Sequence, residues 1–335
     1  MYGKPLKSLI AILSMAISHI AFAGDFPAKN IQGIIMWGAG GSTDSVMRTV
    51  TPAAEKKLNT DIIMINRPGA GGALATKYVN AKRADGYTLL MGAENPQIYK
   101  VLGLSKTDYS DMIPVSLLAQ GISVFVARTD APYNNLKEFV AYARAHPKTV
   151  KAGSTGPAGL PSILLSILKT TENFEVTSVP YNGDGQALTA LLSHAIDVMP
   201  TTYGPAREYI RAGQMKVIGL MDKKPNAQLP GIQPATTYFP ELAKQLPYSA
   251  FFGVFVKKDT PEDVVAKLSD AFNSAARQDN FRQMLDSKGY EYLGLSGQEA
   301  VKYLDRFRSV GSWTIYNAGG AKFSPEAFNI PKISE

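Results

Sequence analysis

The residues best suited to bind a small charged molecule form a glycine-rich loop, Trp37-Gly-Ala-Gly-Gly-Ser-Thr-Asp44, which follows the apolar run 31–36. Glycine lets the backbone take positive φ angles and approach a ligand closely. Ser42 and Thr43 are typical helix caps, so we expect this loop to open a helix that ends near Leu58. Free N–H groups and the positive end of the helix dipole converge at such a start. The loop therefore predicts a site for a carboxylate or phosphate that needs no cationic side chain.

A second loop of the same kind follows the strand-like run 62–66. Its sequence is Arg67-Pro-Gly-Ala-Gly-Gly72, and a helical segment follows from about Ala73 to Ala81. Successive strand–loop–helix units place their loops at the same carboxyl edge of a parallel sheet. We therefore expect the two loops to lie side by side and to bind one carboxylate together.

Apolar runs alternate with amphipathic segments along the whole chain, and this alternation predicts an α/β fold with doubly wound parallel sheets. Strands are expected at 31–36, 62–66, 87–91, 115–119, 122–127, 150–152, 176–180, 196–199, 215–220 and 250–256, and helices at 42–58, 73–81, 136–146, 162–169, 186–192, 205–212, 260–278, 281–288 and 297–317. Everything after residue 256 is expected to be helical.

Two breaks in this pattern predict two domains. The first break is Asp130-Ala-Pro132, and the second is the proline-rich, polar stretch 222–247, which is interpreted as a surface excursion. Domain 1 is then discontinuous, with residues 24–130 and 248–335, and domain 2 comprises residues 131–247. Two crossing segments imply a cleft between the domains that could enclose a small molecule.

The amino terminus has the three parts of a secretory signal peptide. Lys4 and Lys7 precede an apolar segment from Leu9 to about Phe22, and Ala21-Phe-Ala23 stands before Gly24. We expect cleavage near Ala23 and a periplasmic protein. The apolar segment is short for a membrane span, which disfavours an uncleaved anchor, and no cysteine stands near the cleavage point to carry a lipid.

Composition excludes several classes of function. Loss of the signal peptide removes two lysines and no acid, which leaves 33 basic against 28 acidic side chains and a net charge of +5. The basic residues are scattered, so nucleic acid is not an expected partner. The chain has no cysteine. His146 and His194 lack the spacing of metal ligands, so neither a metal nor a cofactor is expected.

An enzyme is the rival class, and its signals are weak. Gly69-Ala-Gly71 begins like a dinucleotide fingerprint, and Glu94 could contact a ribose, but Leu74 stands where the third glycine belongs. The chain has neither a Gly-x-Ser-x-Gly elbow nor a phosphate-binding loop ending in Gly-Lys-Ser/Thr. A secreted enzyme that binds a nucleotide or NAD thus stays only a distant alternative.

Taken together, several motifs resemble the periplasmic solute-binding proteins of tripartite tricarboxylate transporters, also called the Bug family. The motifs are Gly-Ala-Gly-Gly-Ser-Thr-Asp (38–44), Asn-Arg-Pro-Gly-Ala-Gly-Gly (66–72), Asp-Gly-Tyr-Thr-Leu-Leu (85–90), Gly-Ser-Thr-Gly (153–156), Val-Pro-Tyr-Asn-Gly (179–183) and Phe-Phe-Gly-Val-Phe-Val (251–256). The resemblance implies a type II periplasmic binding-protein fold, which closes on a small carboxylate and delivers it to a membrane permease. A sensor kinase is the alternative partner, and a monomer is expected.

The resemblance also implies which residues contact the ligand, largely through main-chain amides and ordered water. Together with the residue-based candidates, the predicted site comprises Trp37, Gly38, Ala39, Gly40, Gly41, Ser42, Thr43, Asp44, Pro68, Gly69, Ala70, Gly71, Gly72, Glu94, Asn95, Ser154, Thr155, Gly156, Tyr181, Asn182, Gly183, Asp197 and Tyr203. Family ligands include di- and tricarboxylates, acidic amino acids, nicotinate and aromatic acids. The family often has proline at positions 36 and 39 and lysine at position 182, so the ligand itself stays open.

Several side chains have two interpretations that the sequence leaves open. Asp44 could complement the helix dipole, or it could face the cleft and hold a water that contacts the ligand. Trp37 could stack on an aromatic acid or pack between the loop and the core. Tyr181 and Tyr203 have the same ambiguity, because tyrosine offers both an apolar face and a hydroxyl group.

Overall fold

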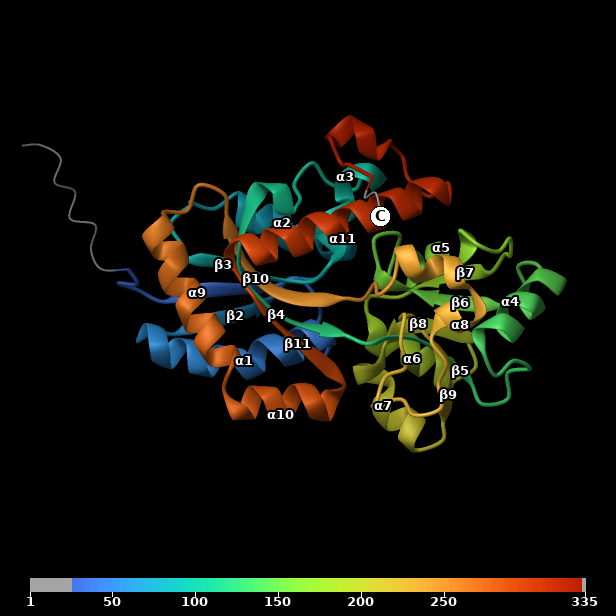
Figure 1. Cartoon of the computed structure of the whole chain (residues 1–335). Helices are drawn as coiled ribbons and strands as arrows, with labels where there is room; N and C mark the ends of the chain where they lie inside the picture. Colours follow the sequence, from blue (N-terminus) through green and yellow to red (C-terminus); the bar gives the residue numbers. More distant parts are fainter. Residues whose placement is uncertain (1–25, 333–335) are drawn as a thin grey trace, which may run out of the picture.

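The computed structural model describes residues 26–332 and shows two α/β lobes side by side (Figure 1). The predicted signal peptide and its cleavage point near Ala23 lie outside the described residues. Within them, no helix is long and apolar enough to cross a membrane.

The first lobe is built on a six-stranded mixed sheet with the order β11-β4-β10-β3-β1-β2. Its strands are β1 (Ile31–Ile35), β2 (Ile62–Asn66), β3 (Thr88–Gly92), β4 (Met112–Gly121), β10 (Phe251–Lys257) and β11 (Tyr290–Leu295). Strands β1, β2 and β3 are parallel as predicted, whereas β10 is antiparallel to β3 and β4. The predicted parallel arrangement thus holds for β1, β2 and β3, and β10 is antiparallel because it re-enters this lobe from the second one.

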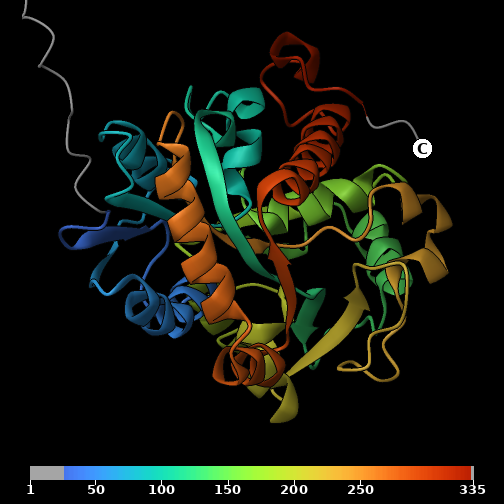
Figure 2. The same ribbon diagram turned by 60° about the vertical axis from the view of Figure 1, so that its left-hand side comes forward.

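Helices cover both faces of this sheet, which explains why its strands are continuous apolar runs. One face carries α1 (Ser42–Leu58), α9 (Glu262–Ala276) and α10 (Asp279–Lys288). The other carries α2 (Ala73–Asn80), α3 (Tyr99–Leu102) and the long α11 (Gly297–Asn317), as Figures 1 and 2 show. Buried aromatic rings fill the centre, where Tyr109 stacks on Phe255 with ring centroids 3.9 Å apart.

The second lobe has a five-stranded sheet with the order β7-β6-β8-β5-β9. Its strands are β5 (Ser123–Arg128), β6 (Lys151–Ser154), β7 (Thr177–Pro180), β8 (Val198–Thr202) and β9 (Met215–Leu220), and its helices are α4 (Leu136–Ala145), α5 (Leu160–Lys169), α6 (Asp184–Leu192), α7 (Tyr203–Arg211) and α8 (Ala235–Tyr238). Strands β6, β7 and β8 are parallel, and β5 runs antiparallel to both β8 and β9. The α/β class with helices around two sheets is thus confirmed.

The first crossing between the lobes lies earlier than the sequence indicated. Strand β5 pairs with β8 and β9 in the second sheet, so the chain changes lobes at Ile122, between β4 and β5. A boundary after residue 130 is therefore too late. We propose that the first lobe comprises residues up to 121 and from 251 onward, and that the second comprises residues 122–250.

Two further segments differ from the prediction. Residues 222–247 are not simply a surface excursion, because Phe239, Leu242 and Leu246 are buried. The region after residue 256 is not wholly helical, since β11 pairs with β4 at the edge of the first sheet. Gly294 and a register shift interrupt this pairing. A short strand of this kind leaves little periodicity in the sequence.

Candidate functional site

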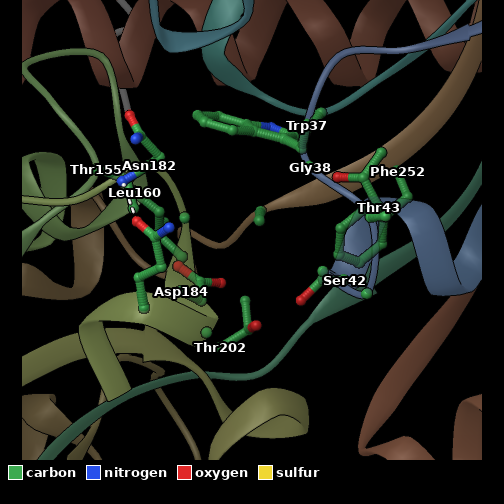
Figure 3. A pocket seen from close by; sticks show the side chains of 18 of the residues that line it. Trp37, Gly38, Ser42, Thr43, Thr155, Leu160, Asn182, Asp184, Thr202 and Phe252 are labelled. Carbon is green, nitrogen blue, oxygen red and sulfur yellow. Dashed lines mark hydrogen bonds between the residues drawn. The ribbon is translucent and has the colours of Figure 1, made fainter. Parts of the chain in front are cut away.

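A cavity of ≈ 370 Å³ lies between the two lobes, at the carboxyl ends of β1 and β3. Its wall consists of residues 37–43, 93, 94, 155, 160, 182–186, 202, 250 and 252. Figure 3 shows Trp37, Ser42 and Thr43 on one side and Thr155, Asn182, Asp184 and Thr202 on the other. The volume falls in the range of small-molecule pockets, about 300–1,000 Å³. We call this cavity the interlobe pocket.

The first glycine loop forms the wall of the interlobe pocket on the first lobe. Helix α1 begins at Ser42, and its N-cap, Gly41, provides no side-chain cap. Within residues 26–332, the amides of Gly41, Ser42 and Thr43 have no hydrogen-bond partner. Gly40 has a φ of +78°, which a residue with a side chain adopts at a cost. Ser42 and Thr43 therefore lie inside the helix instead of capping it, and their free amides can accept an anion.

Asp44 holds this loop in place from behind and is not part of the pocket wall. Its carboxylate accepts hydrogen bonds from the Gly40 amide at 3.0 Å, from Arg48 Nε at 2.8 Å and from Asn66 Nδ2 at 2.8 Å. Burial would raise the pKa of Asp44, but these hydrogen bonds outweigh burial and hold the pKa below its usual value. These contacts favour the interpretation in which Asp44 supports the loop and the helix start, and Asp44 is not among the residues of the pocket wall.

Trp37 lies on the pocket wall and also packs against the apolar core. Its carbonyl oxygen accepts a hydrogen bond from Asn66 Nδ2 at 2.9 Å, which ties the loop to the end of β2. Figure 3 shows the indole ring at the edge of the pocket, extended toward the second lobe. Trp37 thus packs between the loop and the core, and its stacking on an aromatic ligand stays a prediction.

The second glycine loop, residues 68–72, is not part of the pocket wall. It follows β2, which is the edge strand of the first sheet, so it lies one strand further than the first loop from β3 and β10, whose ends line the pocket. The Gly71 carbonyl accepts a hydrogen bond from the Tyr99 hydroxyl at 2.6 Å. A Cβ on Gly72 would lie 2.0 Å from Met36 Cε. None of the predicted residues Pro68, Gly69, Ala70, Gly71 and Gly72 lies on the pocket wall, and Gly72 packs beside Met36, which precedes the first loop.

In the second lobe, the structure brings only part of the predicted set to the pocket. Thr155, Asn182 and Gly183 lie on the wall. Ser154 and Gly156 instead bond within their own loop, since Ser154 Oγ accepts from the Gly156 amide at 3.1 Å. These contacts shape the loop that presents Thr155.

Three other predicted residues of this lobe have structural contacts away from the pocket wall. Tyr181 packs against the second apolar core, and its amide donates to the Ser154 carbonyl at 2.8 Å. Asp197 pairs with Arg128 at 3.0 Å and accepts from the Lys151 amide at 2.9 Å. Tyr203 is buried at the start of α7. Tyr181 and Tyr203 directly adjoin wall residues in the sequence, whereas Asp197 precedes β8, at the end of that strand opposite to Thr202. Position in the sequence alone could not separate these cases.

Glu94 and Asn95 follow β3, and only Glu94 lies on the pocket wall. Glu94 is buried, and its Oε2 atom has no hydrogen-bond partner. Asn95 lies behind it and donates from Nδ2 to the Ala158 carbonyl of the second lobe at 2.7 Å. Asn95 thus connects the two lobes beside the pocket.

Eight residues of the pocket wall were not predicted. They are Ala93, Leu160, Asp184, Gly185, Gln186, Thr202, Ala250 and Phe252. Asp184 to Gln186 directly follow the predicted Gly183 and open helix α6, so the helix-start signal could have found them. The others lie at the ends of β3, β8 and β10 or at the start of α5, and only the arrangement of the sheets brings them together.

Two carboxyl groups dominate the electrostatics of the interlobe pocket. Burial raises the pKa of Glu94 to about 8, and the nearby charge of Asp184 acts in the same direction. Burial also raises the pKa of Asp184 to about 6, although the Thr201 side chain opposes this shift. The wall of the pocket contains no lysine, arginine or histidine side chain. Within residues 26–332, no group of three or more His, Cys, Asp or Glu residues is arranged to hold a metal ion.

A second cavity, of ≈ 1130 Å³, opens on the outside of the first lobe. Its wall is rich in cations, among them Lys77, Lys100, Lys106, Arg308 and Lys322. It includes no residue of the second lobe and none of the predicted site residues. The interlobe pocket, to which both lobes contribute helix starts, is therefore the candidate site.

Two α/β lobes that enclose a small pocket define the class of periplasmic solute-binding proteins. Solved structures of that class have the same fold. Periplasmic binding protein BugD superimposes with a TM-score of 0.79 at 22% sequence identity, over 88% of this chain and 99% of that chain. MatC from Rhodopseudomonas palustris, solved with bound malate, gives a TM-score of 0.75 at 26% identity, over 88% of this chain and 98% of that chain.

Sequence comparison identifies the family. Residues 46–310 match the tripartite tricarboxylate transporter family receptor. A UPF0065 protein of Bordetella pertussis is 30% identical over 309 residues, which cover 90% of this chain and 94% of that protein. Protein BugT of the same organism is 25% identical over 79% of this chain and 82% of its own length. The chain belongs to the tripartite tricarboxylate transporter receptor family, and the resemblance drawn from its motifs is confirmed.

Proposed function

We propose that this protein captures a small carboxylate in the interlobe pocket and delivers it to the membrane permease of a tripartite transporter. The observation that carries the proposal is the start of α1, where three unpartnered amides lie at a pocket that both lobes enclose. Such amides bind a carboxylate through hydrogen bonds and through the helix dipole. MatC, which shares the fold and was solved with malate, supports a carboxylate ligand.

A receptor fits the pocket better than an enzyme. Its wall contains neither a histidine nor a cysteine, so its hydroxyl groups do not belong to a nucleophile–histidine pair of the kind that covalent catalysis uses. Family membership supports a receptor as well. We therefore expect the ligand to leave the protein chemically unchanged.

The proposed place of action is the periplasm. Support comes from the amino-terminal sequence, with Lys4, Lys7 and the apolar segment that ends before Ala21-Phe-Ala23. Mass spectrometry of periplasmic material should find a chain that begins at or near Gly24. Retention of residues 1–23 on most molecules would contradict this location.

Thermal-shift screening of the mature protein tests the function. The panel contains mono-, di- and tricarboxylates, aromatic acids and amino acids, because a ligand that prefers the native state raises the melting temperature. We expect at least one carboxylate to bind with 1:1 stoichiometry in calorimetry and to be recovered intact. A panel without any stabilising carboxylate, or turnover that survives repurification, would contradict the proposal.

A further inference from the structure

The interlobe pocket has two chemically different sides. On the first lobe, the start of α1 presents unpartnered N–H groups, which attract a negative charge. The wall also contains two carboxyl side chains, Glu94 from the first lobe and Asp184 from the second, and no cationic side chain. Within residues 26–332, neither carboxyl group forms a salt bridge. A carboxylate on the wall without a counter-charge repels a carboxylate of the ligand.

Asp184 is the more accessible of the two acids. It is the first residue of α6, it is partly buried, and Figure 3 shows its carboxyl group directed into the pocket, opposite Ser42. Its pKa of about 6 leaves it largely ionised at neutral pH. A ligand held at the start of α1 therefore meets a negative charge on the second lobe.

Glu94 lies deeper, and its surroundings are equally free of cations. It is 4% exposed, and its Oε2 atom is buried without a hydrogen-bond partner. The hydroxyl group of Thr202, on the opposite wall, is also buried without a partner. Buried polar atoms normally have partners, so these atoms indicate that the occupied pocket holds a polar group that the protein itself does not supply. Burial raises the pKa of Tyr99, Tyr109, Tyr248, Tyr290 and Tyr303, and the charge of Glu94, or of Asp184 in the case of Tyr290, acts in the same direction.

These contacts decide what a ligand must carry besides its carboxylate. A second carboxylate beside Asp184 would meet an uncompensated like charge at low dielectric. An ammonium group would instead pair with Asp184 and could donate to Glu94. We infer that the ligand is an amino carboxylate, whose carboxylate lies at the start of α1 and whose ammonium group lies against Asp184, with Glu94 as a second acceptor. This inference rests on the proposed function and narrows its ligand class.

Calorimetry with matched probes tests the inference, since the members of each pair differ only in the amine. The pairs are aspartate and succinate, glutamate and glutarate, 4-aminobutyrate and butyrate, and phenylalanine and 3-phenylpropionate. At pH 7.5 we expect the amine-bearing member of at least one pair to bind about tenfold tighter or more, because it gains a charge-assisted hydrogen bond. A protein that binds succinate, glutarate or another amine-free acid as tightly as any amino acid contradicts the inference and leaves the proposed function intact. Failure of every carboxylate contradicts both.

The Asp184→Asn variant tests whether Asp184 is the residue that binds the ammonium group. The variant keeps the shape of the side chain and removes its charge, so the amine-bearing probe should lose about tenfold in affinity and the amine-free probe should bind equally well or better. Asp279→Asn is the matched control, because Asp279 also opens a helix, α10, but is exposed outside the pocket. Equal affinity changes in the two variants, or an unchanged preference in Asp184→Asn, would overturn the assignment.

The pH dependence of probe binding distinguishes a direct contact of Asp184 with the ammonium group from a merely structural role of Asp184. Between pH 7.5 and 5, protonation of Asp184 should weaken binding of the amine-bearing probe by about tenfold in the native protein and little in Asp184→Asn. Glu94 titrates near pH 8 and is largely neutral over this range, so Glu94→Gln should keep the same decline. A decline that persists in Asp184→Asn would contradict the pairing of the ammonium group with Asp184.

Discussion

The two glycine loops have nearly the same local sequence and different positions in the fold. Both follow a strand, both contain glycines with positive φ, and both precede a helix. The first lies on the wall of the interlobe pocket, whereas the second contacts Tyr99 and Met36 beside it. Strand order explains the difference, because β1 lies between β2 and β3 while β2 is the edge strand. A glycine-rich loop after a strand therefore indicates a possible anion site, and the strand's place in the sheet decides whether that loop reaches the pocket.

The largest expected effect is a loss of ligand affinity, and it should differ between the two loops. Gly40 and Gly71 are a matched pair, with φ of +78° and +60° and no atom within 4 Å of an added Cβ. Gly40→Val should displace the amides of the first loop, and the loss of two charge-assisted hydrogen bonds would weaken binding roughly a hundredfold. Gly71→Val should change affinity only a few-fold at most. Calorimetry that finds equal losses would show that the second loop also contacts the ligand.

The next effect concerns stability and involves the second loop. Gly72→Ala adds a Cβ 2.0 Å from Met36 Cε and 2.9 Å from Tyr99 Oη, at a φ of +90°. Overpacking and the left-handed backbone should together lower the free energy of unfolding by about 2 kcal/mol or more. Gly71→Ala, with open space around it, should cost about 1 kcal/mol. Urea unfolding measures both, and equal costs would show that Gly72 is not close-packed.

Asp44→Ala should test how the first loop is held. It removes three hydrogen bonds and leaves the Gly40 amide without a partner, so we expect a loss of about 1.5 kcal/mol. Because folding lowers the pKa of Asp44, its stabilisation is complete above the unfolded value, 3.8, and is lost as the pH falls through the folded value. The native protein and the variant should therefore converge in stability at acid pH. Asp270→Ala, which breaks only the exposed pair with Lys57, is the control and should have little effect.

The smallest effect compares two tyrosine hydroxyl groups. Tyr99 donates to Gly71 in the second loop, and Tyr109 donates to Ala93 on the pocket wall at 2.5 Å. Each change to phenylalanine should cost about 1 kcal/mol of stability. Only Tyr109→Phe should also weaken ligand binding, by a few-fold, because only Ala93 lies on the pocket wall. Reduced affinity in Tyr99→Phe instead would couple the second loop to the site.

The sequence by itself determined most of the secondary-structure elements and indicated the glycine loop that lies on the pocket wall. Strands 62–66 and 215–220 and helix 297–317 have the predicted bounds, because apolar periodicity and glycine or proline boundaries are local properties of the chain. The chemistry of the loop at 37–43 was equally readable, since glycines before a helix start imply free amides whatever surrounds them. Combined motifs also sufficed to indicate the family that sequence comparison then confirmed.

Only the tertiary structure decided which loops reach the pocket and which residues complete it. Asp44 and Asp197 carry the polar groups of binding residues, but their carboxylates are taken up by Arg48 and Arg128 and by backbone amides. Asp184 and Glu94 lie 90 positions apart in the chain and meet in one pocket because the chain crosses between the lobes at Ile122. Partners, burial and strand order are non-local quantities, so the local sequence pattern could indicate a carboxylate site but could not place Glu94 and Asp184 on the wall of the same pocket.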